Sequence, residues 1–208
     1  MTLLINGIKI NLMNRLFTFL FLIFFSFSAP SFADDIKDLQ IEGISLGDSL
    51  LDHLSKKKII TEIEINKPSY DYLTEKFGEV YLFNKFEIYD HLSFFVKPND
   101  KSYKIYLIKA SIKYNDKIKQ GYAKQKEIVK EFSALYKNTI KYEKTATFPF
   151  DPTGKSNSRY VQFSFDSGDA ITVSCKKYEK SVKIKYKFVD ALSVEISLKE
   201  MEDWLTDY

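Results

Sequence analysis

The chain has 208 residues, of which 31 are basic and 28 acidic, so its formal net charge is only +3 at neutral pH. This near balance argues against nucleic acid as a main partner, because such binding draws on many uncompensated Lys and Arg contacts to phosphate. With a single cysteine, Cys175, no intramolecular disulfide is possible, and stability must come from packing.

The N-terminal segment has the three-part pattern of a secretory signal peptide. An apolar run, Leu16–Phe27, follows Arg15 and precedes a small-residue cleavage site that ends at Ala33. The run has 12 residues, whereas a membrane-spanning helix needs about 20. We therefore expect residues 1–33 to be removed as a signal peptide and residues 34–208 to form a secreted product, periplasmic or extracellular.

The first elements of this product are a short strand and a short helix. The strand ends before Gly47, and Asp48 caps a helix whose apolar side includes Leu50 and Leu54. Alternating apolar and polar residues then predict three strands, at Phe77–Phe83, Tyr89–Val96 and Tyr103–Tyr114.

The middle of the chain changes to helical periodicity. Apolar residues from Lys117 to Lys137 recur at helical spacing, which predicts a long amphipathic helix capped by Asp116. A capping box from Ser197 to Glu200 predicts a last, short helix. Between the two helices four strands are predicted, at Tyr160–Phe165, Ala170–Cys175, Val182–Phe188 and Leu192–Ile196.

Together these elements predict an α+β fold. Strands joined by short turns rather than by helical crossovers pair antiparallel, so we expect antiparallel sheet(s) with a central amphipathic helix and short flanking helices. Residues 34–208 are expected to form a single domain. An alternative division gives two stacked helix-plus-sheet units, residues 34–115 and 116–208.

The turn at residues 166–169 predicts how its two flanking strands pair. One register buries the apolar residues of both strands, including Cys175, on one face of the sheet. A register shifted by one residue would instead pair apolar residues with polar ones. The expected pairs are Phe165 with Ile171, Phe163 with Val173 and Val161 with Cys175.

The predicted strand Val182–Phe188 carries a lysine at every second position. The alternation places Lys183, Lys185 and Lys187 on the face opposite the core. We interpret this face as solvated, with lysines that discourage edge-to-edge aggregation. The alternative is a basic stripe for an acidic partner or for membrane headgroups.

None of the motifs with possible chemistry predicts a site. Gly154 to Ser156 matches the end of a P-loop, but the glycine required five residues earlier is Pro149, and a strand rather than a helix is predicted to follow. His53 and His91 are too few for most zinc sites unless carboxylates complete the shell, and surface positions explain both.

Thiol and carboxylate chemistry is equally unsupported. Alternation places Cys175 on an apolar strand face, which predicts a buried structural thiol rather than a nucleophile paired with a histidine. Neighbouring acids such as Glu202 and Asp203 serve glycoside hydrolysis only if two carboxyls face each other across a cleft. We therefore predict no catalytic, cofactor-binding or metal-binding residues.

Several segments carry a resemblance to known proteins. IEGISLGDSLLDHL from Ile41, the helix KQKEIVKEFSALYKN and the later FDSGDAITVSC are similar to a family of small exported proteins from AT-rich marine bacteria with no established activity. The resemblance implies a secreted context. It also implies that relatives carry a cysteine where this sequence has Gly121, and a disulfide to the position of Cys175 that this chain lacks.

A second resemblance is local. The turn that leads from Gly43 through Gly47 into a short helix, followed by antiparallel strands, resembles small envelope proteins of the β-lactamase-inhibitor-protein type, including the small lipoprotein of the outer-membrane barrel-assembly machine. It favours a binding module over an enzyme.

The sequence therefore predicts an exported soluble non-catalytic protein that binds another protein or an envelope component. It predicts no cofactor, no nucleic-acid partner and no stable membrane span after signal cleavage. The alternatives are a secreted hydrolase with a dispersed carboxylate site and a small-ligand carrier.

Overall fold

The computed structural model describes residues 36–70, 75–83 and 86–207. The predicted signal peptide, residues 1–33, lies outside this part of the chain. In the described part, no helix combines the length and apolar character needed to cross a membrane.

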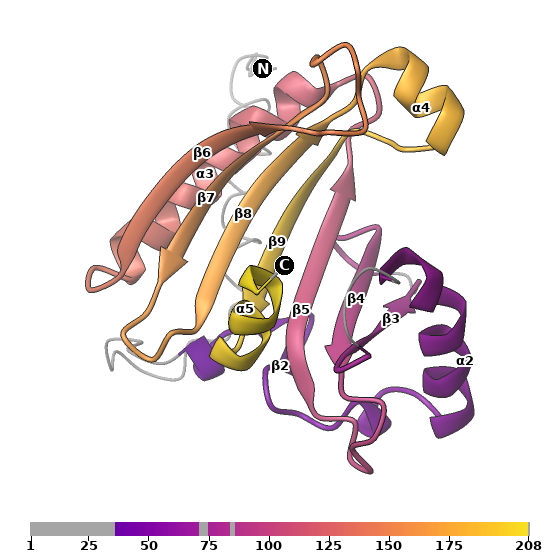
Figure 1. The fold of residues 1–208 in the computed structure, drawn as a ribbon. Helices are drawn as coiled ribbons and strands as arrows, with labels where there is room; N and C mark the ends of the chain where they lie inside the picture. The colour runs from indigo at the N-terminus through magenta and orange to yellow at the C-terminus, as the bar shows by residue number, and fades with distance from the viewer. Residues whose placement is uncertain (1–35, 71–74, 84–85, 208) are drawn as a thin grey trace, which may run out of the picture.

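The fold is α+β, as the sequence predicts, and is built on one antiparallel sheet (Figure 1). Its seven strands lie in the order β3 (Gly78–Leu82), β4 (His91–Val96), β5 (Ile105–Lys113), β9 (Ala191–Ser197), β8 (Ala170–Lys177), β7 (Asn157–Ser164) and β6 (Ile140–Thr147). The last strand in the sequence, β9, pairs with both β5 and β8. Residues 34–115 and 116–208 thus contribute strands to the same sheet.

The remaining elements flank this sheet. A two-stranded hairpin consists of β1 (Gln40–Ile41) and β2 (Ile44–Ser45), and the short 3-10 helices are η1 (Ile36–Asp38), η2 (Leu50–Asp52) and η3 (Lys67–Tyr70). The α-helices are α2 (Lys56–Asn66), α3 (Ile118–Leu135), α4 (Lys180–Tyr186) and α5 (Lys199–Thr206).

One face of the sheet, here called the covered face, carries the main core. The helix α3 packs its apolar side there, and the ring of Phe132 meets Phe163 of β7 edge to face at 6.1 Å. From the same helix, the buried Gln125 donates hydrogen bonds to the carbonyl oxygens of Arg159 and Val173, both at 2.9 Å. The long amphipathic helix predicted at residues 117–137 is confirmed.

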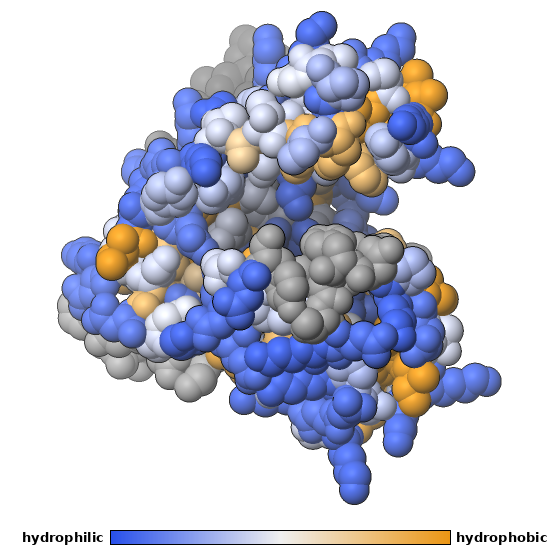
Figure 2. All heavy atoms as spheres, in the orientation of Figure 1, coloured by the Kyte–Doolittle hydropathy of each residue, from blue (hydrophilic) through white to orange (hydrophobic). Residues whose placement is uncertain are grey.

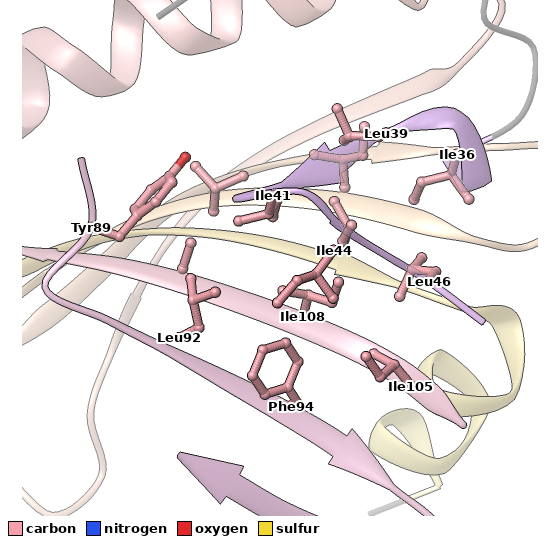
Figure 3. Packing of buried hydrophobic residues seen from close by; sticks show 14 of the residues in the cluster. Ile36, Leu39, Ile41, Ile44, Leu46, Tyr89, Leu92, Phe94, Ile105 and Ile108 are labelled. Carbon is pink, nitrogen blue, oxygen red and sulfur yellow. The ribbon is translucent and has the colours of Figure 1, made fainter. Parts of the chain in front are cut away.

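The N-terminal hairpin and α2 cover the other half of this face. Figure 3 shows Ile41 and Ile44 of the hairpin lying over Ile108 of β5, near Phe94 of β4. The helix α2 was not predicted from the sequence. Its N-cap is Ser55, whose hydroxyl accepts a hydrogen bond from the amide of Lys58 at 3.3 Å.

The strand predicted at residues 182–188 is wrong, because this segment forms α4 followed by an irregular link. Both edges of β8 are occupied, by β7 and β9, so the segment between β8 and β9 has no place in the sheet. Glu179 starts the helix by accepting a hydrogen bond from the amide of Ser181. Of the four apolar residues that alternation assigned to the core, only Val182 is buried.

The predicted register of β7 and β8 is also wrong, by two residues. Ser164 pairs with Ala170, and the turn of residues 165–169 closes through the amide of Phe165 donating to the carbonyl of Asp169 at 3.0 Å. A two-residue shift preserves the face, so Cys175 is buried as predicted, opposite Arg159 instead of Val161. The observed pairs are Phe163 with Ile171, Val161 with Val173 and Arg159 with Cys175.

Three predicted helix caps are replaced by other contacts. Asp48 accepts from the amide of Ser45, and Ser49 caps η2. Asp116 pairs with Lys183, at 3.1 Å between Nζ and Oδ1.

The helix α5 also begins without the predicted capping box. Asp169, from the β7–β8 turn, accepts the amide hydrogen bond of Lys199 at 2.7 Å. A cap from a distant turn is invisible to a local sequence pattern.

Candidate functional site

The second face of the sheet is here called the open face, and among the residues that the structure describes it has no helical layer comparable with that of the covered face. Of the helices, α5 packs across one end of it (Figure 1). Trp204 and Met201 of α5 lie against Phe95 of β4 and Leu107 of β5. The ring centroids of Trp204 and Phe77 are 5.3 Å apart. The open face therefore begins at α5 and continues along the strands toward α4.

Register and alternation arrange the residues of the open face in rows across the strands. The charged row consists of Tyr81, Ser93, Lys109, Glu195, Thr172 and Gln162. The adjacent row, here called the serine row, consists of His91, Ser111, Ser193, Ser174, Tyr160 and Lys144. Small polar side chains thus occupy three central strands side by side.

Within the charged row, Lys109 pairs with the carboxylate of Glu195, and Lys176 lies close enough to affect both charges. The Nζ of Lys109 lies 3.4 Å from Oε1 of Glu195. Lys176 belongs to the row beyond the serines, and its charge interacts with that of Lys109. The neighbouring Lys109 charge and burial lower the pKa of Lys176 to about 8. Although burial opposes it, the two ammonium groups hold the pKa of Glu195 below its ordinary value.

The open face contains buried polar atoms without hydrogen-bond partners. The hydroxyls of Ser111 and Ser193 lie 3.1 Å apart and bond to each other. In contrast, across residues 36–70, 75–83 and 86–207, three buried side-chain atoms lack a partner: Nδ1 of His91 and the hydroxyls of Ser93 and Ser174. All three belong to the open face. Leaving such a group unpaired costs about 1–3 kcal/mol, and all three atoms lie beneath neighbouring side chains rather than at the surface.

At the α5 end, Glu202 points back onto the open face. It accepts a hydrogen bond from Nε2 of Gln162 at 3.0 Å and contacts the hydroxyl of Ser197. Burial raises the pKa of Glu202. Its sequence neighbour Asp203 is exposed and pairs with Lys199, so the structure separates this adjacent acid pair.

At the opposite end, five aromatic rings form a cluster that we call the aromatic tip. Two come from the β6–β7 loop, one from the end of β8 and two from α4 and the link after it: Phe148, Phe150, Tyr178, Tyr186 and Phe188. Centroids of contacting rings lie 4.9 to 5.8 Å apart. Figure 2 shows apolar side chains gathered over α4 and the adjoining loop at the top of the view.

The residues that the motif analysis rejected are not brought together. His53 is exposed at the end of η2, whereas His91 stacks near Tyr81 and Phe83 on the open face. Cys175 lies on the covered face, so it forms no thiol dyad with either histidine. Within the described ranges, no group of three metal-ligating side chains occurs.

The P-loop-like residues 154–156 lie in the β6–β7 loop, and a strand follows them. The carboxylate of Asp151 organises this loop by accepting from the amide of Ser156 at 2.7 Å and from the hydroxyl of Thr153 at 2.7 Å. The loop thus uses its amide groups internally rather than for phosphate.

The sequence analysis did not recognise the open face. Its signal is present in β9, where Ser193, Glu195 and Ser197 alternate with buried apolar residues, and in β8, where Thr172, Ser174 and Lys176 do the same. What the local pattern lacks is the pairing that places these residues in common rows.

The architecture defines an α+β protein with a seven-stranded antiparallel sheet and one open face. No family model, curated protein or solved structure matches the chain.

Proposed function

We propose that the chain is an exported, non-catalytic binding module that docks a partner protein on the open face of its sheet. The observation that carries this proposal is the row of polar and charged side chains on that face, including Lys109, Glu195 and Gln162, over which α5 packs at one end.

Composition and rigidity support a protein partner. Tyrosine, which the open face carries at Tyr81 and Tyr160, is enriched at protein interfaces, and the long lysine side chains of this face can rearrange around a partner. The hydrogen-bonded strands beneath it fix the position of each row, and elements of this kind hold binding groups more precisely than loops do.

The test compares matched substitutions on the two sides of the protein. Gln162→Arg places a long cation on the open face, and Gln120→Arg places the same side chain on the exposed side of α3. Immobilised protein is exposed to an envelope extract of the producing cells. We expect one defined protein to be retained by the wild type and by Gln120→Arg, and retention to fall at least about tenfold with Gln162→Arg.

Equal retention by the two variants, or retention of no defined protein by the wild type, would contradict the proposal. Thermal midpoints of both variants must match the wild type for the comparison to hold.

Hydrolysis is the second candidate function, because two carboxyls at the α5 end have opposite pKa shifts. The pKa of Glu195 is lowered and that of Glu202 is raised, the pattern expected of a base and an acid. It ranks second because Lys109 pairs with Glu195, while Gln162 and Ser197 contact Glu202. Turnover of a polysaccharide by the wild type that Glu202→Gln abolishes would favour it.

A further inference from the structure

The aromatic tip exposes more large apolar side chains than its own packing requires. Ile184 of α4 is 72% exposed, and Phe150 of the β6–β7 loop is 41% exposed. Tyr186, Phe188 and Val189 are also exposed. In Figure 1, α4 projects from the end of the sheet, so these side chains lie on a protruding part of the molecule.

Charges around the tip are arranged asymmetrically. Exposed lysines surround the rings: Lys155, Lys180, Lys185 and Lys187. The Nζ of Lys185 lies 4.8 Å from the centroid of the Tyr186 ring.

In contrast, the acidic residues of this region are engaged internally. Asp151 is buried and accepts bonds within its loop. Asp190 is buried and pairs with Lys183 at 2.9 Å, and Glu179 caps α4. The tip therefore presents apolar rings and exposed ammonium groups to the solvent, although Glu179 lies near Lys155 and the exposed Asp116 pairs with Lys183 of α4.

We propose that the aromatic tip docks on a bilayer surface that carries anionic headgroups. Phe150, Phe188 and Ile184 enter the boundary between headgroups and acyl chains, and the tyrosine hydroxyls remain at headgroup level. The exposed lysines extend toward the anionic groups. The aromatic tip is separate from the rows of the open face, so membrane binding by the tip does not depend on the proposed protein partner.

The shape and chemistry of the tip favour a bilayer over an acidic protein. Protein interfaces are depleted in lysine, whereas the tip is a projection with exposed lysines and with Ile184 largely in solvent. Aromatic residues combined with lysines on one projecting surface are typical of interfacial membrane binding.

The experiment measures co-sedimentation of the exported protein with phosphatidylglycerol vesicles and with phosphatidylcholine vesicles. We expect binding to the anionic vesicles only. Each lysine near an anionic surface contributes about fivefold to partitioning, so Lys185→Gln with Lys187→Gln should weaken binding by about 25-fold. The matched control, Lys126→Gln with Lys130→Gln, changes two exposed lysines of α3 and should retain wild-type binding.

A second pair of variants tests the apolar contribution. Phe188→Ala removes a ring of the tip, and Phe83→Ala removes an exposed ring next to β3, on the far side of the sheet. We expect about a tenfold loss for Phe188→Ala and no loss for Phe83→Ala. Comparison among variants of the same chain cancels any contribution from the rest of the protein.

Insertion is measured directly with one fluorophore. Phe188→Trp in a Trp204→Phe background leaves a single tryptophan, at the tip. Its emission should shift to the blue with anionic vesicles and be quenched by lipids that carry a spin label near the headgroup. Equal binding by the tip and control variants, no blue shift, or capture of an acidic protein without vesicle binding would overturn the proposal.

Discussion

The contact between α5 and the sheet is expected to contribute several kcal/mol to the free energy of unfolding, and Trp204→Ala tests this. Trp204 is 3% exposed and packs against Phe77 and Phe95. A buried tryptophan removes about 200 Å² from water, worth about 5 kcal/mol at about 25 cal/mol per Å². A compact unfolded state lowers that figure to about 3–4 kcal/mol, within the range measured for such truncations.

The assay is thermal unfolding followed by far-ultraviolet circular dichroism, because the variant lacks the only tryptophan of the chain. For a protein of this size we expect the midpoint to fall by about 10 °C. Leu205→Ala is the control on the same helix, since Leu205 is 42% exposed, and it should cost less than about 1 kcal/mol. A loss below about 1 kcal/mol for Trp204→Ala would show that α5 is not docked as described.

Three further predictions follow from burial, charge and the sheet edge. Burial raises the pKa of Cys175 to about 12, so a thiol reagent should label it slowly until the protein is denatured, and rapid labelling of the native protein would contradict its burial. Because burial raises the pKa of Glu202, the stability linked to this group is fully present below its ordinary pKa and is lost as pH rises through the raised value. Glu202→Gln should thus raise the urea midpoint of unfolding at neutral pH relative to the wild type, and this gain should disappear near pH 4. An equal gain at both pH values would contradict a raised pKa of Glu202. The strand β6, at the edge of the sheet, carries Lys141 and Lys144. Replacing both by Thr should increase aggregation, measured by light scattering, with little change in the thermal midpoint of unfolding. Unchanged scattering would show that these lysines do not prevent aggregation.

The elements predicted correctly are those whose periodicity coincides with a buried face. In α3, the helical spacing places Ile128 and Phe132 in the core, and β9 alternates because its neighbours on both sides are strands. The edge strand β6 was missed because seven of its eight residues are exposed, so that neither face of the strand has the buried apolar residues that alternation would show.

The segment that forms α4 shows why alternation alone misleads. Its lysines and apolar residues satisfy period two, but pairing of β8 with both β7 and β9 excludes it from the sheet. The basic residues predicted for a strand face instead belong to a projecting helix. Lys183 pairs with Asp116 and Asp190, whereas Lys185 and Lys187 are exposed.

The open face could not be predicted from the sequence for a related reason. Ser111 and Ser193 hydrogen-bond across 82 residues of sequence, and Ser174 joins their row only through the pairing of β8 with β9. Local patterns place each serine on the polar side of its own strand. They do not state which strands are neighbours.

Site-specific photo-cross-linking tests the proposed function most directly. A photoreactive phenylalanine analogue replaces Tyr142, an exposed residue of β6 on the open-face side, or Lys126, an exposed residue of α3. Both variants are expressed in the producing cells and irradiated there. The proposal predicts one adduct of defined mass from position 142 and none from position 126. Adducts of the same mass from both positions, or from position 126 alone, would contradict docking on the open face.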